Sequence, residues 1–216
     1  MNWHALTRLG EAQILLPAAL LAAGWLAWGL RASATARAWL GLMGLAIALT
    51  TASKLAFMGW GIGVASIDFT GFSGHAMFAA AVYPMLARIA AANASKALQT
   101  AALAMGVILA LLIAVSRLEV HAHSLSEVVT GSSLGLAACG LALAWRPISP
   151  APATPWIPIA LAACLVAVPW KAPPSMTHQL VTQLALSLSL RSHPFTRADL
   201  HRPAKTSRLQ QDHQQG

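Results

Sequence analysis

Long apolar runs, each about the length needed to cross a bilayer, constrain the fold of this chain more than any other feature. A transmembrane helix needs about 20 apolar residues, because the hydrocarbon core of a membrane is about 30 Å thick. Such runs occupy residues 13–30, 38–58, 74–91, 97–115 and 128–145, and a shorter one, interrupted by Pro158 and Pro169, occupies residues 156–170. Only 9% of the 216 residues are charged, whereas soluble domains carry about 25%. The sequence therefore predicts an all-α integral membrane bundle of about six transmembrane helices.

The distribution of polar residues divides the chain into a membrane domain and a tail. Residues 1–170 are expected to form the transmembrane domain. Residues 171–216 are expected to form a polar, basic and partly disordered tail, in which residues 180–190 make a short amphipathic helix. The net charge of +8 would suggest a nucleic-acid partner for a soluble protein, but here membrane topology explains the basic loops and tail. We therefore expect the lipid bilayer, and no nucleic acid, as a partner, and the oligomeric state stays open.

Two polar stretches interrupt the apolar background. One runs from Ser116 to Glu127 and contains an arginine, two histidines and carboxylates, and the other is Ser73-Gly74-His75. Because consecutive spans alternate in direction, the end of the second, the start of the third, the end of the fourth and the start of the fifth lie at one membrane face. The polar residues at that face are Lys54, Ser73, Gly74, His75, Arg117, His123 and Glu127. Topology alone is therefore expected to gather them into one site.

The chemistry of these side chains indicates phosphoryl transfer. His123 and Glu127 are four residues apart, so on a helix they share a face, and the carboxylate can accept a hydrogen bond from one ring nitrogen. The other nitrogen is then available as a nucleophile or base. His75 follows a glycine at an expected helix start, where free backbone N–H groups favour an anion. Lys54 and Arg117 add two cations, and the arginine fork suits phosphate oxygens.

This pattern resembles the type 2 phosphatidic acid phosphatase (PAP2) family of membrane phosphatases. The resemblance rests on Lys54, Ser73-Gly74-His75, Ser116-Arg117, His123 and Glu127. It implies a helical core of six spans in which His123 is the nucleophile that forms a phosphohistidine, Glu127 orients it and His75 protonates the leaving oxygen. The residues implied to hold the phosphate are Lys54, Ser73, Gly74 and Arg117. The resemblance implies a membrane lipid phosphate as substrate, with no metal and no cofactor.

Three features depart from the family's pattern. Gly61 and Ile62 stand where the first motif of the family has Arg-Pro, which removes one phosphate ligand. Phe72 stands where a proline usually precedes Ser-Gly-His. Glu127 replaces the usual aspartate, and because its side chain is one methylene longer, it must pack differently to hold His123.

We therefore interpret the chain as a metal-independent membrane phosphatase that hydrolyses a phosphomonoester or diphosphate on a lipid. Phosphatidic acid, phosphatidylglycerol phosphate and a polyprenyl diphosphate stay open as substrates, because apolar walls bind lipid tails with little residue-level signature. The alternative is a degenerate, non-catalytic family member or a carrier that binds a phosphorylated lipid without turning it over. Phosphate release in detergent micelles distinguishes these two functions.

Several of these residues also have simpler interpretations. A lysine such as Lys54 can extend its ammonium group to the membrane surface without any further role. The pair formed by His123 and Glu127 can be a structural hydrogen bond, and Ser73 can be no more than a helix cap. Asp68, in the loop before Ser73, has no assigned role.

A metal site is a further alternative, because imidazoles and carboxylates are ligands for zinc or manganese. Its ligands would be His75, His121, His123 and Glu127. We disfavour it because Lys54 and Arg117 would repel the cation. His121 lies two residues from His123, points elsewhere on a helix and is expected to be a bystander.

Glycines within the apolar runs are expected to allow close helix packing. Gly131 and Gly135 form a Gly-x-x-x-Gly pattern in the run at residues 128–145. Because neither has a side chain, a neighbouring backbone can approach this face.

The distribution of basic residues predicts the orientation. The face opposite the polar stretches carries Arg31, Arg37, Arg88, Lys96 and Arg146. Loops rich in lysine and arginine stay in the cytoplasm. The site is therefore expected on the non-cytoplasmic face of a bacterial-type inner (plasma) membrane, although the basic tail argues against this orientation.

Overall fold

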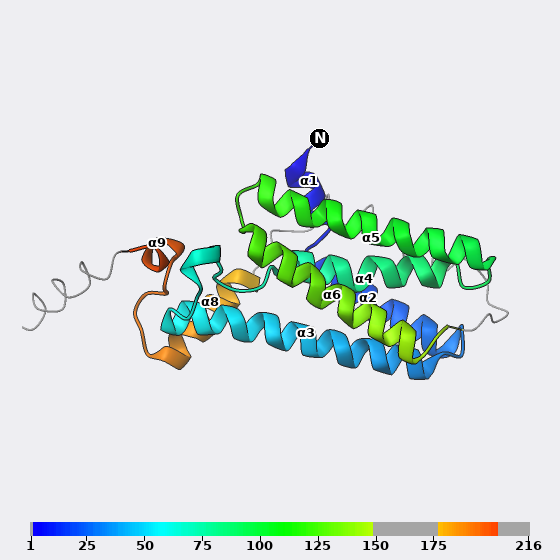
Figure 1. Cartoon of the computed structure of the whole chain (residues 1–216). Coiled ribbons are helices and arrows are strands. Elements are labelled where there is room, and N and C mark those ends of the chain that lie inside the picture. The colour runs from blue at the N-terminus through cyan, green and yellow to red at the C-terminus, as the bar shows by residue number, and fades with distance from the viewer. Residues whose placement is uncertain (1, 149–176, 203–216) are drawn as a thin grey trace, which may run out of the picture.

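Helices make up the regular structure in residues 2–148 and 177–202, the part of the chain that the computed structural model describes (Figure 1). In chain order they are α1 Trp3–Arg8, α2 Ala12–Trp28, α3 Ser33–Trp60, the short 3-10 helix η1 Ala65–Ile67, α4 Gly74–Ala90, α5 Lys96–Glu119, α6 Leu125–Trp145, α8 Thr177–Ser189 and α9 Arg197–Leu200. An isolated antiparallel bridge joins Val64 and Phe69 in the loop after α3. The predicted all-α fold is confirmed.

Three of these helices, α3, α5 and α6, are long and apolar enough to cross a membrane by length and composition. Helix α2 is apolar but shorter. Apolar side chains such as Leu45, Met105 and Leu141 are exposed on the three long helices, as expected of a surface that faces lipid. The membrane helical bundle is confirmed. The number of spans stays a prediction, because residues 156–170 lie outside the described residues. Of the expected tail, residues 171–176 and 203–216 also lie outside them.

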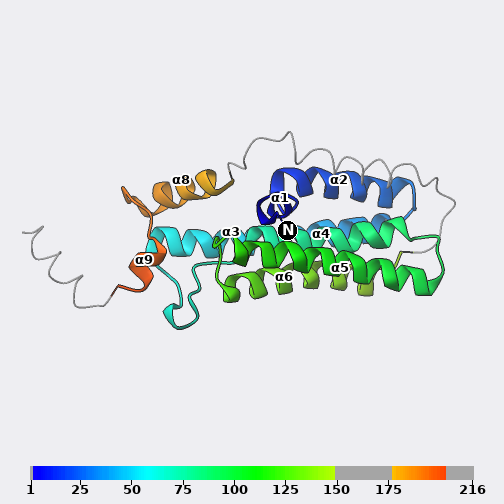
Figure 2. The ribbon, with the colours of Figure 1, turned by 90° about the horizontal axis from the view of Figure 1, so that it is seen from above.

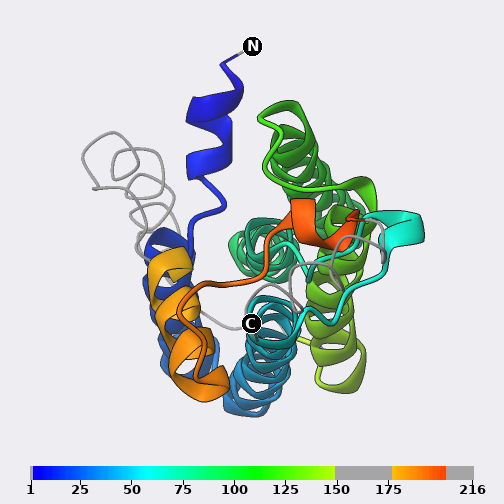
Figure 3. The ribbon, with the colours of Figure 1, turned by 90° about the vertical axis from the view of Figure 1, so that its left-hand side faces the viewer.

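Helix α4 is the centre of the bundle. Seen end-on, it lies among α2, α3, α5 and α6 (Figure 3), and every residue from Ala76 to Met85 is buried. A helix that is surrounded on all sides is apolar all round, and the many alanines of α4 let its neighbours approach closely. The start of α4, with Gly74 and His75, is therefore fixed at the middle of one end of the bundle.

Glycines on α6 fix that helix against the start of α4. A Cβ atom added to Gly131 would lie 2.6 Å from the carbonyl oxygen of Ser73, and one added to Gly135 would lie 2.2 Å from that of Met77. The predicted close packing at both glycines is confirmed. The backbone N–H of Ser73 also donates to the carbonyl oxygen of Glu127 at 3.0 Å. The two polar stretches are thus adjacent because the two backbones touch.

Residues 177–202, called here the C-terminal segment, pack against the end of α3 (Figure 2). Ala185 of α8 is fully buried, and a Cβ atom added to Gly59 of α3 would lie 3.4 Å from its carbonyl oxygen. The hydroxyl of Thr182 donates to the sulfur of Met58 at 3.6 Å. The predicted helix at residues 180–190 is present as α8, and it begins earlier, at Thr177.

The end of α3 makes room for an aromatic side chain of the C-terminal segment. Gly61 has a φ of 69° and ends α3 in the left-handed conformation, which glycine adopts readily. A Cβ atom at this position would lie 3.2 Å from the ring of Phe195. The backbone N–H of Phe195 donates to the carbonyl oxygen of Met58 at 2.9 Å. A residue with a side chain at position 61 would crowd this ring.

The opposite end of the bundle carries the basic residues used for the orientation. There α3 begins, α4 ends, α5 begins and α6 ends (Figure 1). Arg88 donates to the carbonyl oxygen of Ile148 at 3.0 Å, and Thr35 donates to that of Arg146 at 2.7 Å. These bonds tie together helix ends that are far apart in the sequence.

Candidate active site

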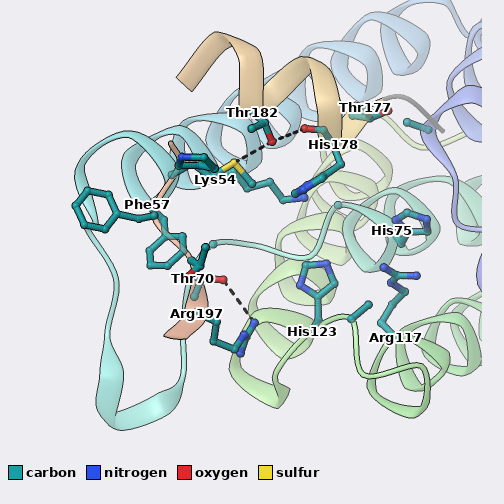
Figure 4. A pocket seen from close by; sticks show the side chains of 18 of the residues that line it. Lys54, Phe57, Thr70, His75, Arg117, His123, Thr177, His178, Thr182 and Arg197 are labelled. Carbon is teal, nitrogen blue, oxygen red and sulfur yellow. Dashed lines mark hydrogen bonds between the residues drawn. The ribbon is translucent and has the colours of Figure 1, made fainter. Parts of the chain in front are cut away.

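The polar residues singled out in the sequence converge on one pocket of about 530 Å³ (Figure 4). It lies where α3 ends and α4 and α6 begin. The sequence-predicted site residues that line it are Lys54, Gly74, His75, Arg117 and His123. Ser73 and Glu127 are fully buried beside it. All seven candidate residues are therefore found at one end of the bundle.

His123 is held by Glu127 in a way that differs from the prediction. Its Nδ1 lies 2.7 Å from Oε2 of Glu127, but His123 is in the loop before α6 and the two residues do not share a helical face. Ser124 is the N-cap of α6, and Glu127, three residues later, turns back over the helix terminus in a capping box. The contact was predicted for the wrong geometric reason. The Ser-x-x-Glu pattern, typical of a helix start, is the sequence signal that predicts this capping box and leaves His123 outside the helix.

The surroundings of His123 favour a neutral ring. Burial lowers the pKa of His123, the cations Lys54 and Arg117 lower it further, and the hydrogen bond to Glu127 acts in the opposite direction without reversing the shift. Because the carboxylate accepts from the Nδ1–H group, the lone pair of the neutral ring is on Nε2. That nitrogen has no hydrogen-bond partner among the described residues, and the ring lines the pocket.

Several donors around the pocket lack partners within residues 2–148 and 177–202. The hydroxyl oxygen of Ser73 is buried and unpaired, as is Nε of Arg117. Ser73 occupies the N-cap position of α4 but makes no cap hydrogen bond, so the interpretation of its side chain as a helix cap is wrong. A Cβ atom added to Gly74 would lie 3.9 Å from the ammonium nitrogen of Lys54. Buried donors normally find acceptors, and an anion at this place would supply them.

The N-terminal residues also shape the pocket. Nη1 of Arg117 donates to the hydroxyl of Thr7 at 2.6 Å, which fixes the guanidinium toward the pocket. Gly10 packs so closely that an added Cβ would lie 3.1 Å from the Cβ of His75. In Figure 4, His75, Arg117 and His123 lie close together at one side of the pocket. Nothing in the sequence pattern predicted that residues before the first apolar run reach the site.

Glu127 has two further partners that the sequence analysis did not identify. The backbone N–H of Thr70 donates to Oε1 at 2.8 Å, and the hydroxyl of Thr70 donates to the same oxygen. Nη2 of Arg197 donates to Oε1 at 2.9 Å and to Oε2 at 2.8 Å. Arg197 belongs to the basic tail, whose charges had been explained by membrane topology, so no local signal set it apart.

Asp68, which had no assigned role, connects the loop after α3 to the C-terminal segment. Its carboxylate pairs with Nη1 of Arg197 and lies 2.7 Å from Nε2 of His201. The hydrogen bond from His201 and the contact with Arg197 hold the pKa of Asp68 below its usual range. The same guanidinium therefore bridges Asp68 and Glu127.

The remaining walls of the pocket are mostly apolar. They include Phe57, Met58, Phe78 and Phe195, together with the polar residues His178 and Thr182. His121 is exposed, with a φ of 52°, and does not line the pocket. Across residues 2–148 and 177–202, no group of three or more histidine, cysteine, aspartate or glutamate side chains is arranged to hold a metal ion.

Comparison with known proteins gives a family and one full-length relative. The sequence model of the PAP2 superfamily matches residues 61–150. A protein from Klebsiella pneumoniae, described as an uncharacterized 22.5 kDa protein in the cps region, is 40% identical over 213 residues, which cover 94% of this chain and 100% of that protein. No solved structure matches the chain. The matched range contains His75, His123 and Glu127, but neither Lys54 nor the C-terminal segment.

Proposed function

This chain belongs to the PAP2 superfamily, and on that basis we propose that it is a membrane phosphatase that hydrolyses a lipid phosphomonoester or diphosphate. One observation carries the proposal. Nδ1 of His123 is occupied by Glu127 at 2.7 Å, so that Nε2 is available to a pocket lined by Lys54, His75 and Arg117. A neutral imidazole held in this way is an activated nucleophile.

The phosphoryl group binds to the donors that lack partners. The ammonium group of Lys54, the hydroxyl of Ser73, the N–H of Gly74 and Nε of Arg117 donate to its oxygens. Hydrogen bonds between charged donors and phosphate are short and strong. Donors fixed in place before the substrate arrives also stabilise the negative charge that develops in the transition state.

In the first step His123 is the nucleophile. Its Nε2 attacks phosphorus, a P–N bond forms and the bond from phosphorus to the lipid oxygen breaks. His75 takes up a proton when the phosphate anion binds beside it and gives that proton to the departing oxygen. Glu127 accepts the hydrogen bond from Nδ1–H and stabilises the imidazolium that forms.

In the second step water hydrolyses the phosphohistidine. His75, now neutral, accepts a proton from the water as its oxygen attacks phosphorus. The P–N bond breaks, inorganic phosphate leaves and His123 returns to the neutral form. The cycle consumes one water molecule and uses neither a metal nor a cofactor.

The position of the pocket supports a lipid substrate. It lies at the end of the bundle where the apolar helices α3 and α5 end and α6 begins, and the end of a helix that crosses a bilayer lies at the level of the lipid headgroups. Its walls combine cations with Phe57, Met58 and Phe78, which suits a phosphate attached to an apolar chain. Phosphatidic acid, phosphatidylglycerol phosphate and a polyprenyl diphosphate each meet this description.

Phosphate release in detergent micelles tests the proposal. The three substrates are compared with and without excess EDTA, and in the presence of vanadate, which resembles the five-coordinate transition state. We expect release of phosphate that persists in EDTA and is inhibited by vanadate. Binding of every substrate without release would favour a non-catalytic carrier, and loss of activity in EDTA would contradict a metal-independent mechanism.

The site faces the non-cytoplasmic side of a bacterial-type inner (plasma) membrane in this proposal. The support is the set of basic residues at the opposite end of the bundle: Arg31, Arg37, Arg88, Lys96 and Arg146. The C-terminal segment adds arginines at the site end, so orientation needs its own test. Cysteine at the exposed Ser66 should react with an impermeant thiol reagent in intact cells, and cysteine at Ser33 should not. The reverse labelling would overturn this orientation.

A further inference from the structure

We propose that Arg197 is a positioning residue of the active site, which orients Glu127 and, through Glu127, the nucleophile His123. The inference rests on the proposed function and extends it to a segment outside the part of the chain matched to the family. Arg197 lies in the C-terminal segment, 70 residues from Glu127 along the chain. Its role follows from contacts, charge and the way in which the segment is attached.

The contacts of Arg197 fix the plane of the Glu127 carboxylate. Nη2 lies 2.9 Å from Oε1 and 2.8 Å from Oε2, so it bridges both oxygens. With the carboxylate held in this plane, Oε1 accepts from Thr70 at 2.8 Å and Oε2 faces Nδ1 of His123 at 2.7 Å. Rotation of the carboxylate would break one of these contacts.

Charge gives Arg197 a second role. The Glu127 side chain is 0% exposed, and a buried carboxylate needs a compensating partner. Its other donors are the backbone and hydroxyl groups of Thr70, the backbone of Ser124 and the ring of His123. Among the residues that the structure describes, Arg197 is therefore the only permanent cation bonded to this carboxylate.

The C-terminal segment is attached so that Arg197 stays in place. Two residues before it, Phe195 packs against Gly61 and donates its N–H group to Met58. Nη1 of Arg197 itself pairs with Asp68. A single guanidinium thus serves two carboxylates at once, which a lysine ammonium, a single point charge, cannot reproduce in the same geometry.

The guanidinium also affects the protonation of His123. The charged and titratable groups that face His123 are Lys54 from α3, His75 from α4, Arg117 from α5 and Glu127 from α6. Arg197 shares the negative charge of Glu127 and so weakens the stabilisation of an imidazolium at His123. Removing Arg197 should therefore raise the pKa of His123, and the acidic limb of the activity profile should move to higher pH.

Full-length variants in micelles test this role. Arg197→Met keeps an apolar stem without the charge, and Arg197→Lys keeps a charge without the fork. Arg202→Ala is the matched control, because Arg202 belongs to the same segment, is 48% exposed and pairs with Asp199 at 3.3 Å. Two quantities are measured: the titration midpoint of the His123 ring by NMR of histidine-labelled protein, and kcat and KM with the lipid substrate.

We expect Arg197→Met to raise the His123 midpoint and to lower kcat about 10- to 100-fold, since small misplacements of reacting groups have effects of that order. KM should change much less. Arg197→Lys should keep the midpoint near that of the unmodified protein and recover part of kcat. Arg202→Ala should leave both quantities unchanged. Should Arg197→Met fail to fold, Asp68→Asn, which removes the charge that holds Nη1, should give a smaller change in the same direction.

Three results separate the possibilities. An unchanged His123 midpoint and unchanged kcat in Arg197→Met would overturn the positioning role. A loss of kcat with an unchanged midpoint and no recovery in Arg197→Lys would also overturn it, because a purely structural role would then suffice. A shifted midpoint in a protein that releases no phosphate from any substrate would support the link from Arg197 to His123 while contradicting the proposed function.

Discussion

The residues matched to the family, 61–150, and the C-terminal segment reach the same carboxylate from different sides. Within the matched range, Glu127 is bonded by His123, Thr70 and Ser124. From the C-terminal segment it is bonded by Arg197. The first region holds the pocket histidines His75 and His123 together with the carboxylate itself, whereas the second contributes the guanidinium of Arg197 from a segment outside the match. The difference suggests that the matched range supplies the chemistry and that the C-terminal segment supplies orientation.

The largest effect is expected at His123, the proposed nucleophile. His123→Ala should abolish phosphate release, because within residues 2–148 and 177–202 no other side chain has a nitrogen in the same position to form the covalent intermediate. The protein should still fold, since the ring of His123 is a wall of the pocket and not part of the helix core. Turnover in micelles measures this effect, with thermal unfolding as the check on folding.

His121→Ala is the matched control for that variant, because His121 is exposed and two residues away. It should keep the activity of the unmodified protein. Loss of activity in His121→Ala with activity retained in His123→Ala would mean that the register of the stretch, and every role derived from it, is wrong.

Glu127→Gln should have the next largest effect and should lower the stability of the protein as well as its activity. Both carboxylate oxygens accept hydrogen bonds from donors, so an amide NH₂ group in either position would face a donor. Leaving buried hydrogen-bonding groups without suitable partners costs about 1–3 kcal/mol, and activity should fall by about 10³-fold or more, as when a catalytic histidine loses its carboxylate. Thermal unfolding and kcat measured together test this, and unchanged stability would contradict the contacts of Arg197 and Thr70.

Packing within the matched range is expected to be the next most sensitive feature. Gly135→Ala should separate α6 from α4, because its Cβ would lie 2.2 Å from the carbonyl oxygen of Met77, and overpacking of this kind costs about 1–3 kcal/mol. Gly140→Ala is the matched control on the same helix, since nothing lies within 4 Å of its added Cβ. Thermal unfolding in detergent compares the two variants. Equal stability would contradict the close contact of α4 and α6.

The smallest of these effects is expected in the C-terminal segment. Phe195→Ala removes the ring that packs on Gly61, so Arg197 is less well fixed although its pair with Asp68 remains. We expect kcat to fall about tenfold, less than in Arg197→Met. Leu188→Ala, at a side chain that is 56% exposed on α8, is the control and should be neutral. A kcat as low as that of His123→Ala would mean that the C-terminal segment is as important for the reaction as the matched range. That result would contradict the difference in role between the two regions.

The sequence predicted the fold and much of the pocket for a physical reason. Apolar runs of spanning length form helices, and helices that alternate in direction place every second loop at the same end. This is enough to bring His75, Arg117 and His123 together without knowledge of any contact. The expected boundaries were less accurate: α6 begins at Leu125, before the expected residue 128.

The contacts of Glu127 with Arg197 and Thr70 were not predictable in this way. They depend on the course of the loop after α3 and on how the C-terminal segment packs against Gly59 and Gly61. Neither is set by hydrophobic periodicity, and an arginine in a basic tail has no local feature that distinguishes it from a solvated charge. Tertiary packing alone brings it to the site.

Direct detection of the phosphorylated enzyme tests the central claim, that His123 attacks phosphorus. The protein is mixed briefly with radiolabelled lipid substrate, quenched at alkaline pH and digested, and the labelled peptide is identified. We expect acid-labile label on the peptide that contains His123, and no label in His123→Ala. Label on another residue, or phosphate release by the unmodified protein with no labelled intermediate under any quenching time, would contradict the account.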